Sequence, residues 1–253
     1  MHSPFNGLKS YSHYWLLGCL LTLPSLALGQ VDSLINLLET VSEEDTPTIL
    51  NALCWELRNE DSRRALSYGL QSIEASKTAK DPYNLIKAYS FTGVVYRNLG
   101  YYREALEYYT LGLELALTED DREQQCYGYI NIANLFLLIE NPEFSLQQLK
   151  RSQSLAVELN NPSILGYLHL NFGRVYLALE QNDSALFHLQ EALDIREATG
   201  TPHNQSVCKK YLGDAYYQLA DFKAAQRAYE EAITMMYMDN DQALFSATLN
   251  GLA

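Results

Sequence analysis

The sequence is poor in basic residues, in cysteine and in the residues that interrupt helices. Its 253 residues include 18 Lys and Arg against 31 Asp and Glu, a formal net charge of −13. Because a nucleic-acid-binding surface must be basic to replace phosphate counterions, this balance argues against nucleic acid as a partner. Only 13 Gly and 7 Pro exclude collagen-like and Gly/Pro-rich low-complexity chains, and four Cys are too few for a disulfide scaffold.

The sequence also lacks the motifs of common catalytic and cofactor sites. It contains no G-x-x-x-x-G-K-[ST], H-E-x-x-H or G-x-S-x-G, and no G-x-G-x-x-G. The acidic runs 43–45 and 119–121 lack the spacing of a calcium loop. His169 and His188 lie on different expected helices, so we interpret them as packing residues rather than metal ligands. We therefore expect no catalysis, no metal and no cofactor in this chain.

Residues 1–29 predict an export signal. They hold one Lys or Arg, Lys9, no acidic residue, and the apolar stretch 15–28. That stretch suits the core of a signal peptide and is short for a membrane span. Small residues at 27 and 29 predict cleavage before Gln30, and an uncleaved signal anchor is the alternative. We expect the remainder in the periplasm or on the extracytoplasmic face of the inner membrane, with Cys54, Cys126 and Cys208 as small buried residues.

The rest of the sequence repeats with a period of 40 residues. Small residues recur in two columns and aromatic residues in a third, while Pro82, Pro162 and Pro202 each follow a residue that can cap a helix. Within each unit the apolar residues have helical spacing, so each unit is expected to be two helices that bury their faces by stacking. The columns are Gly93, Ala133, Gly173 and Gly213; Ala65, Ala105, Ser145, Ala185 and Ala225; and Tyr96, Phe136, Tyr176 and Tyr216.

This order of small and aromatic residues resembles the tetratricopeptide repeat. The segments 212–216 and 92–96, each followed by the expected small and aromatic residues, match its pattern most closely. The 40-residue period resembles the longer-helix variant of the family, whose usual repeat is about 34 residues. The resemblance covers roughly residues 48–253. It implies an all-α, right-handed superhelical solenoid of about five helix-turn-helix repeats plus a half repeat at the C-terminus.

The expected boundaries follow the period. Residues 1–29 are the signal, and 30–47 are a capping helix and loop, with the amphipathic helix at Val31–Val41. Pro142 and Asn182 replace the aromatic residue found at Tyr102, so we expect less standard turns there. The repeats are 48–80, 81–120, 121–160, 161–200 and 201–240, followed by the partial unit 241–253. An array ending on half a unit exposes an apolar face, which favours truncation; a lone terminal helix acting as a cap is the alternative.

A solenoid of helical pairs has a concave surface lined by the first helix of each pair. The columns face into the stack, so side chains opposite them are expected on this surface. The candidates are Lys87, Ser90, Arg97 and Asn98; Tyr127, Asn131, Asn134 and Leu138; Tyr167, Asn171 and Arg174; and Lys210, Asp214, Tyr217 and Gln218.

The chemistry of these candidates favours a peptide. Each Asn amide both donates and accepts, so Asn131, Asn134 and Asn171 are suited to the backbone of an extended peptide, with tyrosines as aromatic anchors. The alternative is that the family commonly carries Asn at these positions without a ligand. Some members grip a C-terminal carboxylate with Lys and Arg, but the corresponding positions here hold Ser90, Val94, Ile130, Val207 and Tyr211, which argues against such a clamp.

We therefore expect a non-catalytic module that recognises a protein or peptide outside the cytoplasmic membrane. The layout of signal, short helix and long repeats resembles the extracytoplasmic N-terminal region of membrane sensor histidine kinases of Bacteroidetes-type bacteria. That resemblance implies that this chain is the sensory part and that a membrane span and kinase follow it. A complete, free-standing exported scaffold is the alternative. The membrane is expected as a partner only through an uncleaved signal or such a span, and the sequence does not decide between monomer and homodimer.

Overall fold

The computed structural model describes residues 27–199, 202–239 and 248. These residues form helices and no strand, which confirms the all-α class. The first twenty-six residues of the predicted signal and nearly all of the predicted half repeat lie outside them. The helices are α2 (Ala27–Leu38), α3 (Thr46–Leu57), α4 (Ser62–Ala79), α5 (Pro82–Asn98), α6 (Tyr102–Thr118), α7 (Arg122–Leu138), α8 (Pro142–Leu159), α9 (Pro162–Ala178), α10 (Asn182–Thr199), α11 (Pro202–Gln218) and α12 (Phe222–Asp239).

Capping side chains start several of these helices, including first helices where the sequence predicts them. The carboxylates of Asp81 and Asp121 accept the backbone N–H groups of Asn84 and Gln124, both at 3.0 Å. The Asn141 and Asn161 amides accept backbone N–H groups in the first turns of α8 and α9 in the same way. Such a bond satisfies one of the amide groups left open at a helix start. The helices α5, α7, α9 and α11 therefore begin 40 residues apart.

The turns inside the pairs are alike, so the expectation of less standard turns before Pro142 and Asn182 is wrong. The residue two places before each second helix has a left-handed backbone: φ is 82° at Gly100, 59° at Glu140 and 57° at Glu180. In each turn the next N–H bonds to the carbonyl five residues earlier at 2.9 Å. This helix-ending pattern uses backbone groups alone. An aromatic side chain after the turn is therefore not needed to form it.

The N-terminal helix has different bounds from those predicted. α2 begins at Ala27 and ends at Leu38, whereas the expected amphipathic helix was Val31–Val41. The predicted helix end fails because Ser42 bonds to the Asp45 carboxylate at 2.8 Å, which favours a turn into α3 over further helix. Val31 and Leu34 are buried in the same hydrophobic cluster as residues of α3. α2 thus covers the first face of the stack and extends across the predicted cleavage point, which stays a prediction.

Small residues let the two helices of a pair approach closely. A Cβ atom built on Gly173 of α9 would lie 2.5 Å from Leu189 of α10, and one on Gly213 of α11 would lie 2.5 Å from Tyr229 of α12. Ala185 in α10 is fully buried, in the hydrophobic cluster that includes residues of α9. The small columns therefore lie at the crossing of the helices, as the periodicity predicts.

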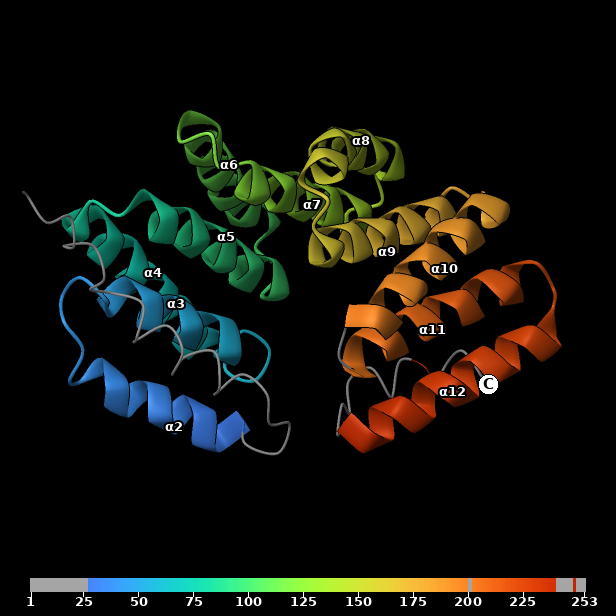
Figure 1. The fold of residues 1–253 in the computed structure, drawn as a ribbon, viewed down its shortest axis with the longest axis horizontal. Helices are drawn as coiled ribbons and strands as arrows, with labels where there is room; N and C mark the ends of the chain where they lie inside the picture. Colours follow the sequence, from blue (N-terminus) through green and yellow to red (C-terminus); the bar gives the residue numbers. More distant parts are fainter. Residues whose placement is uncertain (1–26, 200–201, 240–247, 249–253) are drawn as a thin grey trace, which may run out of the picture.

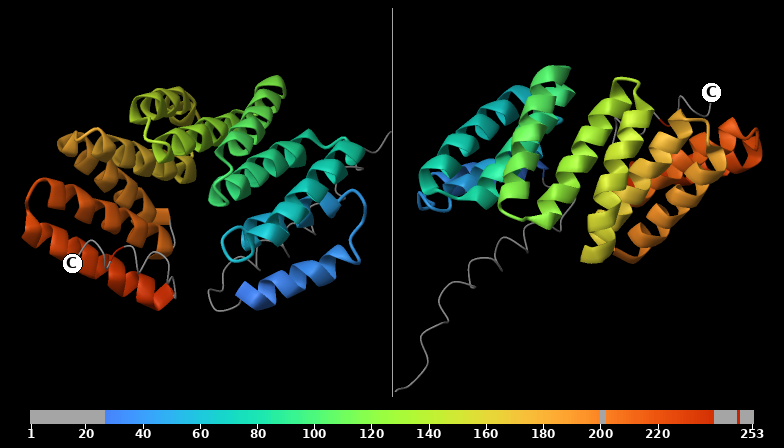
Figure 2. Two further views of the ribbon diagram at one scale, coloured as in Figure 1. Left: turned by 180° about the vertical axis from the view of Figure 1, so that it is seen from behind. Right: turned by 90° about the horizontal axis from the view of Figure 1, so that it is seen from above.

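Stacked in chain order, the pairs form an arch with α2 and α12 at its two ends (Figure 1). Seen from above, the helices follow one another across the molecule in sequence order (Figure 2). The first helices α3, α5, α7, α9 and α11 contact one another from pair to pair, whereas α6 and α8 lie on the outer side of the arch. The first helices therefore line the inner surface, which is where we look for a site.

Candidate functional site

The inner surface carries a hydrogen-bonded polar cluster that joins α7 to α9. The guanidinium of Arg174 donates to the side-chain oxygens of Asn134, at 2.8 Å, and Asn171, at 2.9 Å. Asn134 also donates to the hydroxyl of Tyr167 at 3.1 Å. The structure therefore brings together four of the residues predicted from sequence, drawn from two adjacent repeats.

A second cluster joins α11 to α12 beside the first. Lys210 pairs with Asp214 at 2.6 Å, and the Tyr229 hydroxyl donates to the other oxygen of the same carboxylate at 2.8 Å. The ring of Tyr211 lies between the two clusters, 4.4 Å from the Lys210 amine and 5.4 Å from the Arg174 guanidinium carbon. Asp214 is thus already compensated within the protein.

An open cavity of about 450 Å³ lies between these clusters. Its walls combine the predicted residues Arg174, Asp214 and Tyr217 with two leucines, Leu137 and Leu177, that the sequence reasoning missed. Leu137 and Leu177 lie 80 and 40 residues before Tyr217, so the 40-residue spacing would have found them. The full lining is Leu137, Arg174, Leu177, Ala178, Tyr211, Asp214, Tyr217, Gln218 and Tyr229.

The asparagines predicted as peptide ligands are not equivalent. Asn171 is 1% exposed; its amide nitrogen donates to the Tyr167 carbonyl and its oxygen accepts from Arg174, so it is used inside the protein. The side chain of Asn134 is used in the same way, since its nitrogen donates to Tyr167 and its oxygen accepts from Arg174. Asn131 makes no side-chain hydrogen bond to any described residue, and its polar atoms are not among those sealed from solvent. Of these three asparagines, Asn131, which is 9% exposed, is therefore the one whose amide is not used by another described residue.

The remaining candidates lie farther along the inner surface or outside the clusters. The Tyr127 ring is 6.4 Å from that of Tyr167, and burial raises the pKa of Tyr127 to about 12. Lys87 bonds to the Tyr83 hydroxyl one turn earlier in α5 rather than to another repeat. Arg97 donates to Asn98, which in turn donates to Asn59 at 3.1 Å. Ser90 is buried, and Leu138, Tyr217 and Gln218 are exposed.

The histidines form a packed pair away from the cavity. The Nδ1 atoms of His169 and His188 are 3.2 Å apart, and the His188 ring stacks on Phe172 and Tyr176. Burial, and secondarily the neighbouring His169, lowers the pKa of His188 to about 4. Burial also lowers the pKa of His169, against the opposing charge of Glu191.

We expect this pair to make folding stability fall as the solution is acidified. The unfolded chain binds a proton at His188 near its ordinary pKa of 6.5, whereas the folded chain does so only near 4, so acid favours unfolding between these values. The substitution His188→Phe, which keeps the stacking, should flatten the pH dependence between pH 7 and pH 5. Urea unfolding of both chains across that range measures the difference, and parallel curves would contradict the assignment.

The described residues offer no sign of a metal centre or a reactive thiol. They contain no group of three or more His, Cys, Asp and Glu side chains arranged to hold a metal ion. Cys54, Cys126 and Cys208 are buried and not joined in disulfides, and burial raises the pKa of Cys54 to about 12 and of Cys208 to about 11. These thiols stay protonated at neutral pH. Within the same described ranges, no helix has the length and hydrophobicity to cross a membrane.

Comparison with known proteins agrees with this architecture. Residues 88–123 and 164–237 each match a model of the tetratricopeptide repeat, so the chain contains tetratricopeptide repeats. No curated protein matches the sequence.

Solved structures share the fold at low sequence identity. A Rap protein complexed with Competence and Sporulation Factor superposes with a TM-score of 0.76 at 13% identity, over 95% of this chain and 70% of that one. NprR in complex with its cognate peptide NprX gives 0.71 at 15% identity, over 97% and 73%. BtubC from P. vanneervenii gives 0.63 at 20% identity, over 88% and 92%. At these identities the likeness shows the fold alone.

Proposed function

We propose that this chain is a non-catalytic recognition module that binds an extended peptide segment along its inner surface. The observation that carries the proposal is the cavity between α7, α9 and α11, whose lining combines hydrogen-bonded polar side chains such as Arg174 with apolar ones such as Leu137 and Leu177. Such a mixture of polar and apolar walls is typical of ligand sites. Two structures of the same fold were solved as complexes: the Rap protein with Competence and Sporulation Factor, and NprR with its cognate peptide NprX.

The residues on this surface suit a peptide backbone. The free amide of Asn131 can donate to a peptide carbonyl and accept a peptide N–H. The rings of Tyr127 and Tyr167 offer flat apolar contact at little entropic cost, and the hydroxyl of Tyr167 is held by Asn134. Because these side chains are ordered before binding, little affinity is lost in arranging them.

Selection from a random 12-residue peptide library on the purified chain tests this function. We expect binders whose affinity, measured by fluorescence anisotropy of synthetic copies, falls about tenfold in Asn131→Ala and in Tyr167→Ala. Gln147→Ala, on an exposed position of the outer helix α8, is the matched control and should bind as the wild type does. The proposal fails if selection yields no binder, or if every binder tolerates both inner-surface variants.

We further propose that the module is exported and is the sensory N-terminal part of a membrane signalling protein such as a histidine kinase. The signal-like residues 1–29 and the 40-residue spacing of the first helices, as in the longer-repeat variant of the family, support this reading. A free-standing exported scaffold is the alternative. Immunoblotting of fractionated native cells separates them: a membrane band well above 28.7 kDa supports the sensor, and an exported soluble band near that mass supports the scaffold.

A further inference from the structure

Charge is segregated between the two sides of the solenoid. The chain as a whole has 18 basic and 31 acidic residues, yet the first helices α3, α5, α7, α9 and α11 carry six basic and only three acidic residues. The second helices α4, α6, α8, α10 and α12 carry nine basic and thirteen acidic residues. The first helices therefore carry a small excess of basic residues in a protein that is strongly negative, although Arg122, Lys209 and Lys210 are paired with carboxylates.

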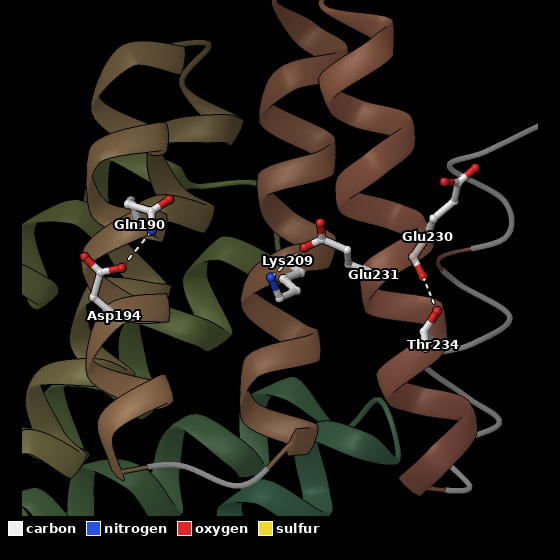
Figure 3. Close-up of polar contacts among 6 residues, drawn as sticks. All are labelled: Gln190, Asp194, Lys209, Glu230, Glu231 and Thr234. Carbon is white, nitrogen blue, oxygen red and sulfur yellow. Dashed lines mark hydrogen bonds and ion pairs between the residues drawn. The ribbon is translucent and has the colours of Figure 1, made fainter.

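The Arg174 guanidinium has no carboxylate partner within the described part of the chain. Its hydrogen bonds go to two neutral amide oxygens, those of Asn134 and Asn171, and it is only partly exposed in the cavity wall. Lys209 on α11 shows the contrast, since it reaches Glu231 of α12 at 2.6 Å (Figure 3). Asp214, the acidic residue in the cavity lining, is held by Lys210 and Tyr229. The Arg174 guanidinium is thus held by hydrogen bonds in the cavity wall, and its positive charge is not balanced by a carboxylate of the described residues.

The same pattern continues toward the N-terminal end of the inner surface. Arg97 of α5 bonds to the amide of Asn98, and Arg58, which follows α3, lies over the Trp55 ring at 3.7 Å. Neither makes an ion pair with a carboxylate of the described residues. Burial lowers the pKa of the Arg58 guanidinium; the charge of Glu56 opposes this lowering and that of Arg97 adds to it, so Arg58 and Arg97 lie within electrostatic range. Like charges held near each other favour an anion between or beside them.

We propose that the peptide bound on this surface is acidic, and that the side-chain carboxylate of an Asp or Glu docks on Arg174 in the cavity. The proposal rests on the function proposed above. A neighbouring apolar side chain of the peptide would lie against Leu137 and Leu177, the apolar part of the same wall. Arg174, Arg97 and Arg58 can bind several carboxylates. Acidic side chains along an extended peptide supply several carboxylates, whereas a peptide C-terminus supplies one.

Two random 12-residue libraries test the proposal on the full chain: one displayed internally, with both peptide ends joined to carrier protein, and one with free C-termini. Each is selected on the wild type, on Arg174→Gln and on Arg103→Gln. Arg103 is the matched control because its side chain is 90% exposed on the outer helix α6, where it pairs with Glu104 and with no other carboxylate of the described residues. We expect Asp and Glu to be enriched in internal binders of the wild type and of Arg103→Gln, and not of Arg174→Gln.

Synthetic binders then supply a test that does not depend on any variant of the protein. Changing the selected Asp or Glu to Asn or Gln should weaken binding to the wild type about tenfold, measured by anisotropy, and should have little further effect on Arg174→Gln. Arg174→Lys, which keeps the charge and loses the planar fork, should retain part of the preference for acidic peptides. Circular dichroism melts confirm that each variant is folded.

The outcomes separate this proposal from the one on which it rests. Recovery of no binder overturns both. Binders that need Asn131 but show no acidic preference, or that bind Arg174→Gln as well as the wild type, overturn only the acidic ligand. Binders that come solely from the free C-terminal library also overturn it, because they indicate recognition of a terminal carboxylate.

Discussion

Replacing Gly173 by leucine is expected to lower the free energy of unfolding by about 3 kcal/mol or more. A Cβ atom at this position would lie 2.5 Å from both Cγ and Cδ2 of Leu189, which is fully buried in α10. The extra side chain therefore has no room unless α9 and α10 separate. Because α9 also packs on α7 and α11, their separation would weaken the contacts with the neighbouring repeats as well.

Chemical denaturation followed by circular dichroism measures this cost. Ala178→Leu, at an exposed position of the same helix, is the matched control and should change stability by less than about 0.5 kcal/mol. Combining Gly173→Ala with Leu189→Ala should cost less than the sum of the two single changes, because each makes space for the other. A Gly173→Leu chain as stable as the wild type would show that the helices do not cross at this residue.

Replacing Asn51 by leucine is expected to cost about 3 kcal/mol, by leaving buried polar groups without partners. Asn51 is 3% exposed in α3. Its amide nitrogen donates to the carbonyl and side-chain oxygens of Asn84 in α5, at 3.0 and 3.2 Å, and its oxygen accepts from Ser72 in α4 at 2.9 Å. One side chain thus links three helices of two repeats, and a leucine can make none of these bonds.

An exposed amide supplies the control for this prediction. Asn98 also bonds across 39 and 40 residues, to Asn59 and to the Arg58 carbonyl, but water can replace those bonds. Asn98→Ala should therefore cost less than about 1 kcal/mol. Hydrogen exchange should show the loss of protection in Asn51→Leu centred on α3, α4 and α5. Equal costs for the two substitutions would contradict the role of burial.

The three asparagines at positions 51, 131 and 171 show how far a repeat pattern predicts a site. They occupy equivalent places in their repeats, since they are separated by multiples of 40 residues. Asn51 joins helices in the core, Asn171 holds Arg174, and Asn131, 9% exposed, has no side-chain hydrogen bond to a described residue. Sequence reasoning nominated Asn131 and Asn171 for the same role. Their different environments depend on side chains from other repeats, which a periodic pattern does not specify.

The sequence by itself determined the helical class, the starts of the first helices α5, α7, α9 and α11, and the close crossings within pairs. These features are local or periodic: an Asp or Asn cap acts within one turn, and a small residue such as Gly173 is needed wherever two helices cross. The bounds of α2 and the geometry of the turns before α8 and α10 were predicted wrongly. They depend on competing hydrogen bonds, such as that between Ser42 and Asp45, whose balance is not visible in a hydrophobic pattern.

Only the tertiary structure decided which polar side chains are free, which are paired and what they surround. The Arg174 guanidinium, the Tyr211 ring and the Tyr229 hydroxyl come from three helices, and their arrangement around one cavity depends on the angle at which those helices stack. Helix stacking also decides that His169 meets His188 and that the Asp214 carboxylate accepts a hydrogen bond from Tyr229. These side chains have no fixed spacing in the sequence, and they meet because the helices that carry them pack together. That packing depends on the whole array and not on any one repeat.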